Sequence, residues 1–413
     1  MLKILINAYA CSPDMGSEPG MGWNWILAIA RHCEVYVITE SEFKERIEAV
    51  LKTSGLKARI HFFYNPVSEK VRRMCWNQGD WRFYWYYWKW QRKTANIARD
   101  ICRQHHIDII HQLNMIGFRE PGCLYDVAKE FNIPMVWGPI GGLKQFPLKY
   151  ANNWKMKVFQ YIKNKLNILQ IKYYPRITHA LNNADALISS IPDSYHTIKQ
   201  YTGIESVIIP ETGCKDYIHN ENRKFDEDIL NVVWAGKFDY RKRIDIAIKA
   251  IAQSDNPQIR LHIYGTGNEE QVKEVTSLIK SLHLESQVKL YGNMSHDDVE
   301  KAMLSAHMFF FTSVNEDTST VVLEAISNGL PVLCFDTCGM SAVIDDTVGR
   351  KIPLSTPELS IKDFANNLNY FHKNRNELKI FSDNCRKKSS ELSWKNKGNI
   401  IMNIYKQLTE QKI

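Results

Sequence analysis

The feature that most constrains this chain is the alternation of short apolar runs with amphipathic stretches, which continues from end to end of its 413 residues. Apolar runs of strand length predict buried strands, and the amphipathic stretches between them predict helices. Regular alternation of the two favours an α/β fold built on parallel sheets. The expected strands are 3–8, 34–39, 60–64, 107–111, 134–137 and 186–189 in the first half, and 231–235, 260–264, 287–291, 308–312 and 331–335 in the second.

The length predicts two domains of about 200 residues each, because single hydrophobic cores rarely grow larger. The segment from Pro210 to Asp228 is polar, lacks periodicity and contains helix-breaking residues, so it is the expected linker. We therefore expect a first domain at 1–212 and a second at 213–389. A ligand is expected in the cleft between two such lobes, at the carboxyl ends of the strands.

The composition, with 44% hydrophobic and 24% charged residues, is that of a soluble globular protein. Its apolar runs fall short of the roughly 18 residues that span a bilayer. The nine cysteines are scattered without a Cys-x-x-Cys pair, which predicts neither a zinc site nor a disulfide framework. A reducing, cytoplasmic setting is therefore expected.

Two segments of the first half, 71–93 and 143–176, are both basic and aromatic, within a chain of net charge +8. Cationic and amphipathic side chains together suit the headgroup region of an anionic membrane. They also suit single-stranded nucleic acid. A third reading is structural, because Trp81, Trp85 and Trp88 have helical spacing and could form a core face.

A pair of carboxylates marks the second half. Glu316 and Glu324 are separated by seven residues and flank a predicted strand-to-helix turn. Thr318, Ser319 and Thr320 are candidate N-caps, and a helix that begins here points free N–H groups at the strand edge. Such a turn suits a sugar diphosphate, whose phosphates take N–H groups and whose hydroxyls donate to carboxylates. The alternative is an acidic loop followed by an ordinary amphipathic helix.

Other turns are expected at the same sheet edge. The segment 234–243 follows a strand and brings Lys237 and Lys242 into one turn, where they could hold a diphosphate. Gly265 and Gly267 form a Gly-x-Gly turn after the next strand, which permits close approach of a ligand to the backbone. Two further turns with glycine and small or hydroxyl residues follow, at 291–295 and 336–341.

In combination these residues resemble the retaining nucleotide-sugar glycosyltransferases of family 4. The resemblance covers the second half in order, and it implies the GT-B fold, in which two Rossmann-like, doubly wound parallel-sheet domains face a central cleft. It implies that Glu316 binds the transferred sugar and that Glu324 binds the ribose. The remaining implied donor contacts are Lys237 and Lys242 on the diphosphate, the amides of Thr320, Val321 and Val322 on the distal phosphate, and the turns with Gly265, Gly267, Tyr291, Gly292 and Asn293 beside the base.

The first half would then be the acceptor lobe. Its loop at 16–22 stands where the family has a glycine loop facing the diphosphate, which places Gly16 on the donor. A bacterial subgroup that builds surface polysaccharides has a similar Gly-Ser-Glu-x-Gly loop and a Trp-Gly-Pro-x-Gly-Gly turn, here 137–142. The commonest family pattern has a His near that turn, and 136–142 contain none. The acceptor-side candidates are therefore His111, Ser17, Glu18 and Gly141. The terminal helix, 390–413, is expected to return to the first lobe.

The resemblance implies transfer of a hexose from a nucleotide diphosphate sugar, with UDP favoured and GDP possible, to a glycan. We expect this glycan to be lipid-linked, at the inner face of the cell membrane, in polysaccharide biosynthesis. The lysines and helix-end amides are expected to carry the phosphate charge, so no metal and no cofactor is expected, and nucleic acid is not an expected partner. The alternatives are a related sugar phosphorylase or nucleotide-sugar epimerase, and a non-catalytic module that binds nucleic acid through the basic aromatic segments.

Overall fold

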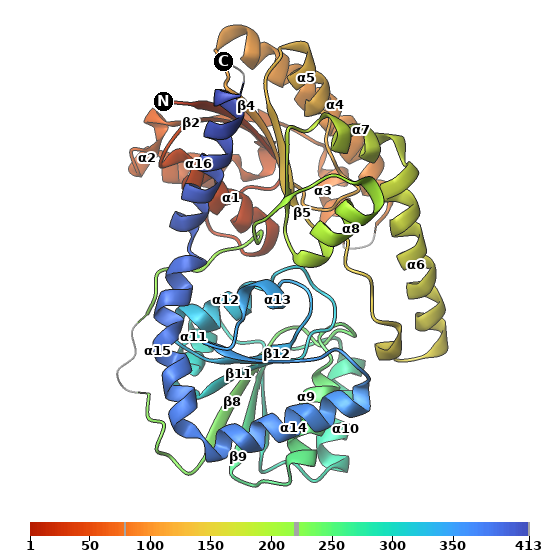
Figure 1. The fold of residues 1–413 in the computed structure, drawn as a ribbon, viewed down its shortest axis with the longest axis vertical. Coiled ribbons are helices and arrows are strands. Elements are labelled where there is room, and N and C mark those ends of the chain that lie inside the picture. Colours follow the sequence, from red (N-terminus) through yellow and green to blue (C-terminus); the bar gives the residue numbers. More distant parts are fainter. Residues whose placement is uncertain (78–79, 219–222, 412–413) are drawn as a thin grey trace. The chain divides into compact units, whose positions relative to one another are not determined.

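The computed structural model describes residues 1–77, 80–218 and 223–411, and the chain forms two compact units (Figure 1). The first unit comprises Met1–Leu143, Asn167–Glu211 and Trp394–Ile413, and the second comprises Lys144–Leu166 and Thr212–Ser393. The chain therefore passes between the units four times. Each unit is built on one sheet whose strands all pair in parallel.

The first unit contains a seven-stranded sheet in the order β3-β2-β1-β4-β5-β6-β7. Successive residues of β1 face opposite sides of it: Ile4 and Ile6 join one core cluster and Leu5 joins another. Both faces are covered, as parallel sheets require. The strands are β1 Lys3–Ala8, β2 Glu34–Glu40, β3 Ile60–Asn65, β4 Ile109–Asn114, β5 Met135–Ile140, β6 Ala186–Ser189 and β7 Val207–Ile208. The helices are α1 Ser17–Ala30, α2 Lys44–Thr53, α3 Glu69–Trp76, α4 Arg82–Gln104, α5 Leu124–Glu130, α7 Pro175–Asn183, α8 Pro192–Thr202 and α16 Trp394–Glu410, with 3-10 turns at Ser41–Phe43 and Leu56–Ala58.

The second unit contains a six-stranded sheet in the order β10-β9-β8-β11-β12-β13. In both sheets the first strand lies beside the fourth, and this point of reversal is where doubly wound folds bind ligands. The strands are β8 Leu230–Ala235, β9 Ile259–Tyr264, β10 Val288–Gly292, β11 Met308–Phe311, β12 Val332–Phe335 and β13 Gly349–Ile352. The helices are α9 Ile244–Ser254, α10 Glu269–Ser281, α11 His296–Ser305, α12 Thr320–Ser327, α13 Met340–Val343, α14 Pro357–Lys373 and α15 Arg375–Glu391, with a 3-10 turn at Leu148–Tyr150.

The predicted α/β class with two parallel sheets is confirmed. β1 and β6 have the expected bounds, whereas β4 begins at Ile109 rather than 107 and ends at Asn114. The sequence did not predict β7 or β13. β7 has two residues, and β13 carries Arg350 and Lys351 in a four-residue strand, so neither forms an apolar run. Within the described residues, no helix is long and apolar enough to cross a membrane.

The segment 144–166 groups with the second unit, whereas the sequence-based division placed it in the first. The cause is burial: Phe146 and Tyr150 belong to the core of the second unit. The Tyr150 hydroxyl lies 2.7 Å from Ser360 Oγ, and Arg243 Nη1 donates to the Tyr150 carbonyl at 3.0 Å. Two buried aromatic rings thus fix a segment that is distant in the sequence. The helix α6, Trp154–Tyr173, contains residues of both units.

The C-terminal helix α16, dark blue in Figure 1, belongs to the first unit. Ile401 and Tyr405 are fully buried in the same core cluster as β1 and α1. At the beginning of α16 the Trp394 ring packs edge-on against Trp25, with 5.9 Å between ring centroids. The buried Lys397 donates to the carbonyl of Pro210 at 2.8 Å. The helix therefore completes the first unit.

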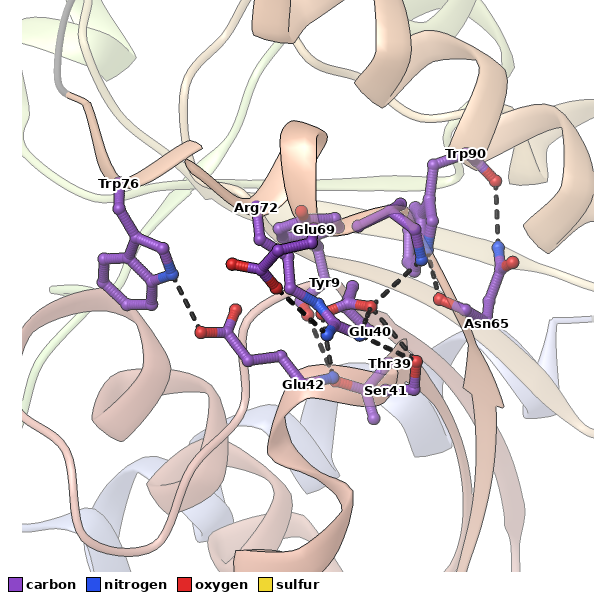
Figure 2. A network of polar contacts seen from close by, with 11 residues as sticks. Tyr9, Thr39, Glu40, Ser41, Glu42, Asn65, Glu69, Arg72, Trp76 and Trp90 are labelled. Carbon is purple, nitrogen blue, oxygen red and sulfur yellow. Dashed lines mark hydrogen bonds and ion pairs between the residues drawn. The ribbon is translucent and has the colours of Figure 1, made fainter. Parts of the chain in front are cut away.

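A buried carboxylate at the end of β2 anchors α3. Glu40 is fully buried, and its oxygens accept two hydrogen bonds from Arg72, at 3.0 and 3.1 Å (Figure 2). The amides of Glu42 and Val67 also donate to it. Figure 2 also shows the exposed indole of Trp76 donating to Glu42. Arg72 lies in the basic aromatic segment 71–93, but its charge is paired inside the unit rather than free for a partner.

The core face of α4 differs from the tryptophan stripe that the spacing suggested. Phe83, Tyr87 and Trp90 are buried beside Tyr9, within 5.8 Å between ring centroids. Trp81 and Trp85 are instead 76% and 51% exposed. The reading of the tryptophans as a core face is therefore wrong for these two residues, because Phe83, Tyr87 and Trp90 already fill that face.

Candidate active site

Three glycine turns lie together at the carboxyl edge of the second sheet. Gly236 follows β8, Gly265 follows β9 and Gly292 ends β10. The Gly236 amide donates to the Tyr264 carbonyl at 3.0 Å, and the Gly265 amide donates to the Gly292 carbonyl at 2.7 Å. Gly265 has φ +144, and a Cβ there would lie 1.8 Å from the Gly236 carbonyl oxygen. Only glycine fits at this position, so the edge presents closely packed backbone to a ligand.

Tyr264 and Tyr291 form a stacked pair beside these turns, with 4.5 Å between their centroids and 9° between their planes. Burial, assisted by the neighbouring Tyr291, raises the pKa of Tyr264 to about 12. The Tyr291 hydroxyl lies 3.0 Å from His262 Nδ1, and Lys289 Nζ lies 4.8 Å from the Tyr291 ring. Asn293 is exposed next to Gly292. The structure thus brings the predicted residues of 264–267 and 291–293 together at one edge.

Lys242 and Glu316 form an ion pair at the same edge. Lys242 Nζ lies 2.5 Å from Glu316 Oε1, and the two side chains are 13% and 14% exposed. Lys242 Nζ also lies 4.8 Å from the centre of the Phe311 ring at the end of β11. Two residues that were predicted to bind different parts of one donor are therefore in direct contact, about 74 positions apart in the chain.

The basic turn before α9 is less positive than its sequence indicates. Arg241 pairs with Asp239, and Arg243 pairs with Asp245, each at 2.8 Å. The helix begins at Ile244, so the cations lie in the turn before the helix rather than in its first residues. Lys237 is exposed in this turn. The sequence did not reveal the two Arg–Asp pairs, which leave Lys237 and Lys242 as the candidates for a phosphate.

The amino end of α12 points two amides away from the helix. Ser319 is the N-cap residue and its side chain makes no capping bond. The Val322 amide donates to the Ser319 carbonyl at 3.1 Å, and its contact with phosphate stays a prediction. The amides of Thr320 and Val321 have no acceptor among the described residues. These two N–H groups, with the positive end of the helix dipole, form the expected anion site.

The loop that carries Glu316 is held by the turn after β12. The Glu316 amide donates to Cys338 Sγ at 3.2 Å, and the Gly339 amide donates to the Asp317 carbonyl at 3.3 Å. A Cβ at Gly339 would lie 2.3 Å from Thr318 Oγ1. The predicted turn at 336–341 therefore positions the carboxylate loop by close backbone packing.

Glu324 lies on α12 and contacts a residue that the sequence analysis missed. Its Oε1 lies 3.0 Å from His296 Nε2, at the beginning of α11. The Glu324 side chain is 19% exposed and the His296 side chain is 49% exposed, so both are accessible. A lone His at a helix start carries no sequence signal. Only the adjacency of α11 and α12 brings it to the site.

The acceptor-side candidates of the first unit share the carboxyl edge of its sheet. Glu18 Oε1 accepts a hydrogen bond from the Ile116 amide at 2.7 Å, and the Gly141 amide donates to the Ile116 carbonyl at 2.8 Å. Ile116 therefore links two candidates that are more than 120 positions apart. Gly16 and Ser17 are exposed at the beginning of α1. The described contacts hold Glu18 and Gly141 in place, and their roles stay predictions.

His111 is placed differently from the other candidates. It is fully buried, and its ring lies 2.5 Å from the Tyr405 hydroxyl through Nδ1 and 2.7 Å from the Gly138 carbonyl through Nε2. A carbonyl only accepts, so Nε2 carries the proton and Nδ1 accepts from Tyr405. Burial lowers the pKa of His111 to about 4. Both ring nitrogens are occupied inside the first unit, so His111 links β4 to α16, and its role on the acceptor side stays a prediction.

The described residues contain no group of three or more His, Cys, Asp or Glu side chains that could hold a metal ion. The predicted independence from metals stays a prediction.

Comparison with known proteins identifies the second unit. Residues 216–388 match the family model of the glycosyl transferases group 1. This range contains Lys237, Lys242, Glu316 and Glu324, together with all three glycine turns. The second half of the chain is therefore similar to the glycosyl transferases group 1, in the residues on which the resemblance rests.

Curated relatives match parts of the chain. The gpi3 subunit of the phosphatidylinositol N-acetylglucosaminyltransferase of Schizosaccharomyces pombe is 27% identical over 168 residues, which is 38% of this chain and 36% of that protein. The N-acetylgalactosamine-N,N'-diacetylbacillosaminyl-diphospho-undecaprenol 4-alpha-N-acetylgalactosaminyltransferase of Campylobacter jejuni is 27% identical over 186 residues, 43% of this chain and 47% of that protein. The chain thus spans less than half the length of each.

A solved structure matches the whole chain. Anabaena Alr3699/HepE in complex with UDP has a TM-score of 0.63 at 16% identity, over 98% of this chain and 100% of that one. At this identity the likeness concerns the fold, and the fold of two Rossmann-like parallel-sheet domains is confirmed.

Proposed function

We propose that this chain, whose second unit is similar to the glycosyl transferases group 1, transfers a hexose with retention from a nucleotide diphosphate sugar to a glycan acceptor. UDP is the favoured nucleotide and GDP a possible one, and the acceptor is lipid-linked in polysaccharide biosynthesis. The observation that carries the proposal is the contact between Lys242 and Glu316 beside the amino end of α12. A cation, a carboxylate and free amides meet at one sheet edge.

Each part of that edge suits one part of the donor. The amides of Thr320 and Val321 bind the distal phosphate, and Lys242 and Lys237 supply positive charge along the diphosphate. Glu316 accepts hydrogen bonds from hydroxyls of the transferred sugar, and Glu324 accepts them from the ribose. His296 holds the Glu324 carboxylate by the bond at 3.0 Å. The glycine turns contact the nucleotide base through their backbone rather than through bulky side chains.

The proposed chemistry is stabilisation of the leaving group. The bond between the anomeric carbon and the phosphate oxygen breaks, and a bond from the acceptor oxygen to the same face of that carbon forms. The acceptor's proton passes to the departing phosphate. Preorganised charges and N–H groups of this kind commonly contribute most to catalysis, because they need no reorganisation as charge develops. In this scheme the chain's own lysines and amides carry the phosphate charge.

The proposals on nucleotide and acceptor have separate support. UDP is favoured because the Anabaena protein of similar fold was solved with UDP. A lipid-linked acceptor is supported by the Campylobacter relative, whose name describes a diphospho-undecaprenol substrate. These properties belong to the relatives, and they define which donors and acceptors are tested first.

Peripheral association with an anionic membrane is supported by the helix α6. This helix buries polar side chains and exposes apolar ones. Its buried side chains include Gln160, Asn164 and Asn167. Its exposed apolar side chains are Trp154, Val158, Phe159, Tyr161, Ile162, Leu166, Leu169 and Tyr173. Residues 144–173 carry seven lysines and no Asp or Glu. An exposed apolar stripe among lysines suits the headgroup boundary of anionic lipids, on the inner face of the cell membrane.

The proposed function is tested by thermal stabilisation with UDP-, GDP-, ADP- and TDP-sugars. A specific donor raises the melting temperature by mass action, by an amount that grows with its concentration above Kd. Release of free nucleotide diphosphate is then followed with and without acceptor. A transferase releases it when the acceptor is present, whereas an epimerase releases none. Absence of stabilisation by every nucleotide sugar would refute the proposal.

A further inference from the structure

The first unit contains a cavity of about 590 Å³ that the proposed chemistry does not use. Its walls come from α4, from the loop after β4, and from the end of α6 and the beginning of α7. All of its lining residues belong to the first unit. Cavities that bind small ligands typically measure about 300 to 1,000 Å³, so this one is large enough for one or two sugar rings.

Aromatic rings form one wall of the cavity. Tyr84, Trp85 and Trp88 lie there on successive turns of α4. Lys89 Nζ lies 3.5 Å from the centre of the Trp85 ring, and the Arg92 guanidinium lies 5.0 Å from that of Trp88. Each cation is four residues after its ring, so the helix itself steadies both indoles. Flat, fixed rings of this kind offer a surface to the apolar face of a sugar.

Two other residues that line the cavity have unsatisfied polar atoms. Glu120 is buried, with an exposed fraction of 6%, and its Oε2 has no hydrogen-bond partner among the described residues. Arg176 Nε and Nη2 are also buried without a partner there. Buried polar atoms are nearly always paired, so an acceptor and two donors left open in one cavity point to a ligand. Burial, opposed by Arg176 and Arg119, raises the pKa of Glu120 to about 7.

The remaining polar wall is already ordered. Arg119 Nε donates to Gln170 Oε1 at 2.7 Å, and its Nη2 donates to Asn167 Oδ1. These bonds fix the loop after β4 against α6. The open atoms of Glu120 and Arg176 therefore belong to a preorganised wall rather than to a mobile one.

The combination selects a neutral ligand. A cation would meet the guanidinium groups of Arg119 and Arg176, and an anion would meet the carboxyl group of Glu120, whose unpaired Oε2 is buried. A sugar hydroxyl both donates and accepts, so neighbouring hydroxyls of one ring can satisfy Glu120 Oε2 and Arg176 together. We propose that this cavity of the first unit binds a neutral saccharide unit of the acceptor. The role as acceptor subsite rests on the proposed function, whereas saccharide binding itself does not.

The test uses the full chain and saturation-transfer NMR with methyl glycosides of glucose, galactose, mannose and N-acetylglucosamine. Trp85→Ala removes part of the aromatic wall, and Glu120→Gln removes the carboxylate charge. Trp81→Ala is the matched control, because Trp81 is an exposed tryptophan close to α4 that does not line the cavity. We expect saturable binding of at least one glycoside, weakened about tenfold by Trp85→Ala and about fivefold by Glu120→Gln, and unchanged in Trp81→Ala.

Two results with glycosides would overturn the proposal: no saturable binding of any glycoside, or a loss of binding in Trp81→Ala equal to that in Trp85→Ala. A third would be that the protein binds inorganic pyrophosphate instead of glycosides and that Trp85→Ala abolishes this pyrophosphate binding. If Glu120→Gln does not fold, Trp85→Ala still tests the proposal, because Trp85 is half exposed and its removal should not prevent folding. UDP affinity, measured in the same samples, separates the two hypotheses. Glycoside binding without UDP binding would refute the proposed function and support saccharide binding in the cavity. UDP binding without glycoside binding would support the proposed function and refute saccharide binding in the cavity.

Discussion

Lys242 and Glu316 illustrate how one pair of side chains can serve two parts of a donor. They lie 2.5 Å apart and mostly buried, so a cationic and an anionic side chain meet at the sheet edge. Removing one member leaves the other as a partly buried charge without its partner, so single substitutions report more than the lost ligand contact. The predictions for this pair therefore compare nucleotide affinity with the rate of transfer. A loss of stability or of affinity alone would not separate the proposed role of Lys242 on the diphosphate from that of Glu316 on the sugar.

The two glutamates are expected to have different roles. Glu316→Ala should abolish transfer and leave nucleotide affinity nearly unchanged, because Glu316 faces the transferred sugar in the proposed site. Glu324→Ala should weaken the nucleotide by roughly ten- to hundred-fold, since a charge-assisted hydrogen bond contributes about 1.5–3 kcal/mol. Calorimetric titration with UDP measures both, with the exposed Glu285→Ala as control. Equal losses for Glu316→Ala and Glu324→Ala would contradict this division.

Lys242 is expected to act mainly in the transition state. Lys242→Ala should lower kcat more than it lowers donor affinity, because charge on the leaving diphosphate grows as the bond breaks. Lys237→Ala, in the same turn but exposed, is the matched comparison and should have the smaller effect.

Activity of the wild-type chain should also survive chelation of divalent ions by EDTA. Loss in EDTA with recovery in magnesium or manganese would mean that a metal carries the phosphate charge. Unchanged turnover in Lys242→Ala would remove the proposal for this lysine.

His111 should make the first unit sensitive to acid. Its folded pKa of about 4 lies below the ordinary value of 6.5, so the unfolded chain takes up the proton first as pH falls. Stability should therefore decline between about pH 6.5 and pH 4, by roughly 3 kcal/mol in total. Calorimetric unfolding across this range should show the decline in the wild type and a smaller one in His111→Gln. Identical pH profiles for the two proteins would contradict the assignment.

At the residue scale, the sequence predicted which groups share the donor edge but not all of their contacts. The Glu316 and Glu324 spacing, the glycine turns and Lys242 were predicted because each lies in the turn after an apolar run of strand length, or one helical turn beyond it. His296 and the pairing of Arg241 and Arg243 with aspartates were missed, because these contacts depend on side-chain directions that spacing does not encode. The burial of His111 was also missed, because the burial of a strand end is decided by the element that covers it, here α16.

At the scale of elements, α6 departs most from the expected pattern. A helix of a soluble unit normally buries its apolar stripe, and α6 instead buries amides. The buried amides make specific bonds: Asn164 Nδ2 donates to the Phe146 carbonyl, and its Oδ1 accepts from the Phe146 amide, both at 3.0 Å. These bonds determine which face turns inward, and the apolar face is left outward.

Membrane binding should therefore depend on that outward face. Ile162→Ser with Leu166→Ser should reduce sedimentation with anionic vesicles at low salt by several fold, because the apolar area buried in the bilayer falls. Ile380→Ser, which changes an equally exposed isoleucine on α15, is the control and should leave sedimentation unchanged. Binding of the wild type should also weaken as salt rises. Failure of the wild type to sediment with the vesicles would refute the idea.

Periodicity predicted most elements because both sheets are buried on two faces, so their strands form continuous apolar runs. The elements that periodicity did not predict depend on contacts with distant parts of the chain. β7 and β13 gain their strand conformation from a neighbouring strand rather than from their own composition, and 144–166 joins the second unit through Phe146 and Tyr150. Such long-range contacts carry no local pattern.

At the scale of the whole molecule, the first unit depends on the last residues of the chain. Truncation after Ser393 removes the contact of Trp394 with Trp25, the bond of Tyr405 to His111, and the buried Ile401. We expect the first unit to melt at a much lower temperature while the second still binds UDP. Scanning calorimetry would then show two separate transitions.

Tyr405→Phe is the conservative control for this truncation. It removes only the hydroxyl and leaves His111 Nδ1 buried without a donor, which costs about 1–3 kcal/mol. A truncated chain with an unchanged first transition would contradict the role of α16.

The return of α16 also has a consequence for synthesis. A polypeptide leaves the ribosome from its amino end, and domains usually begin to fold as soon as they are complete. Here the chain passes Ser393, the last residue of the second unit, before it reaches Ile401 and Tyr405, which belong to the core of the first unit. The unit whose synthesis begins before that of the second is thus completed after it, and until then the core beside β1 lacks these two buried side chains.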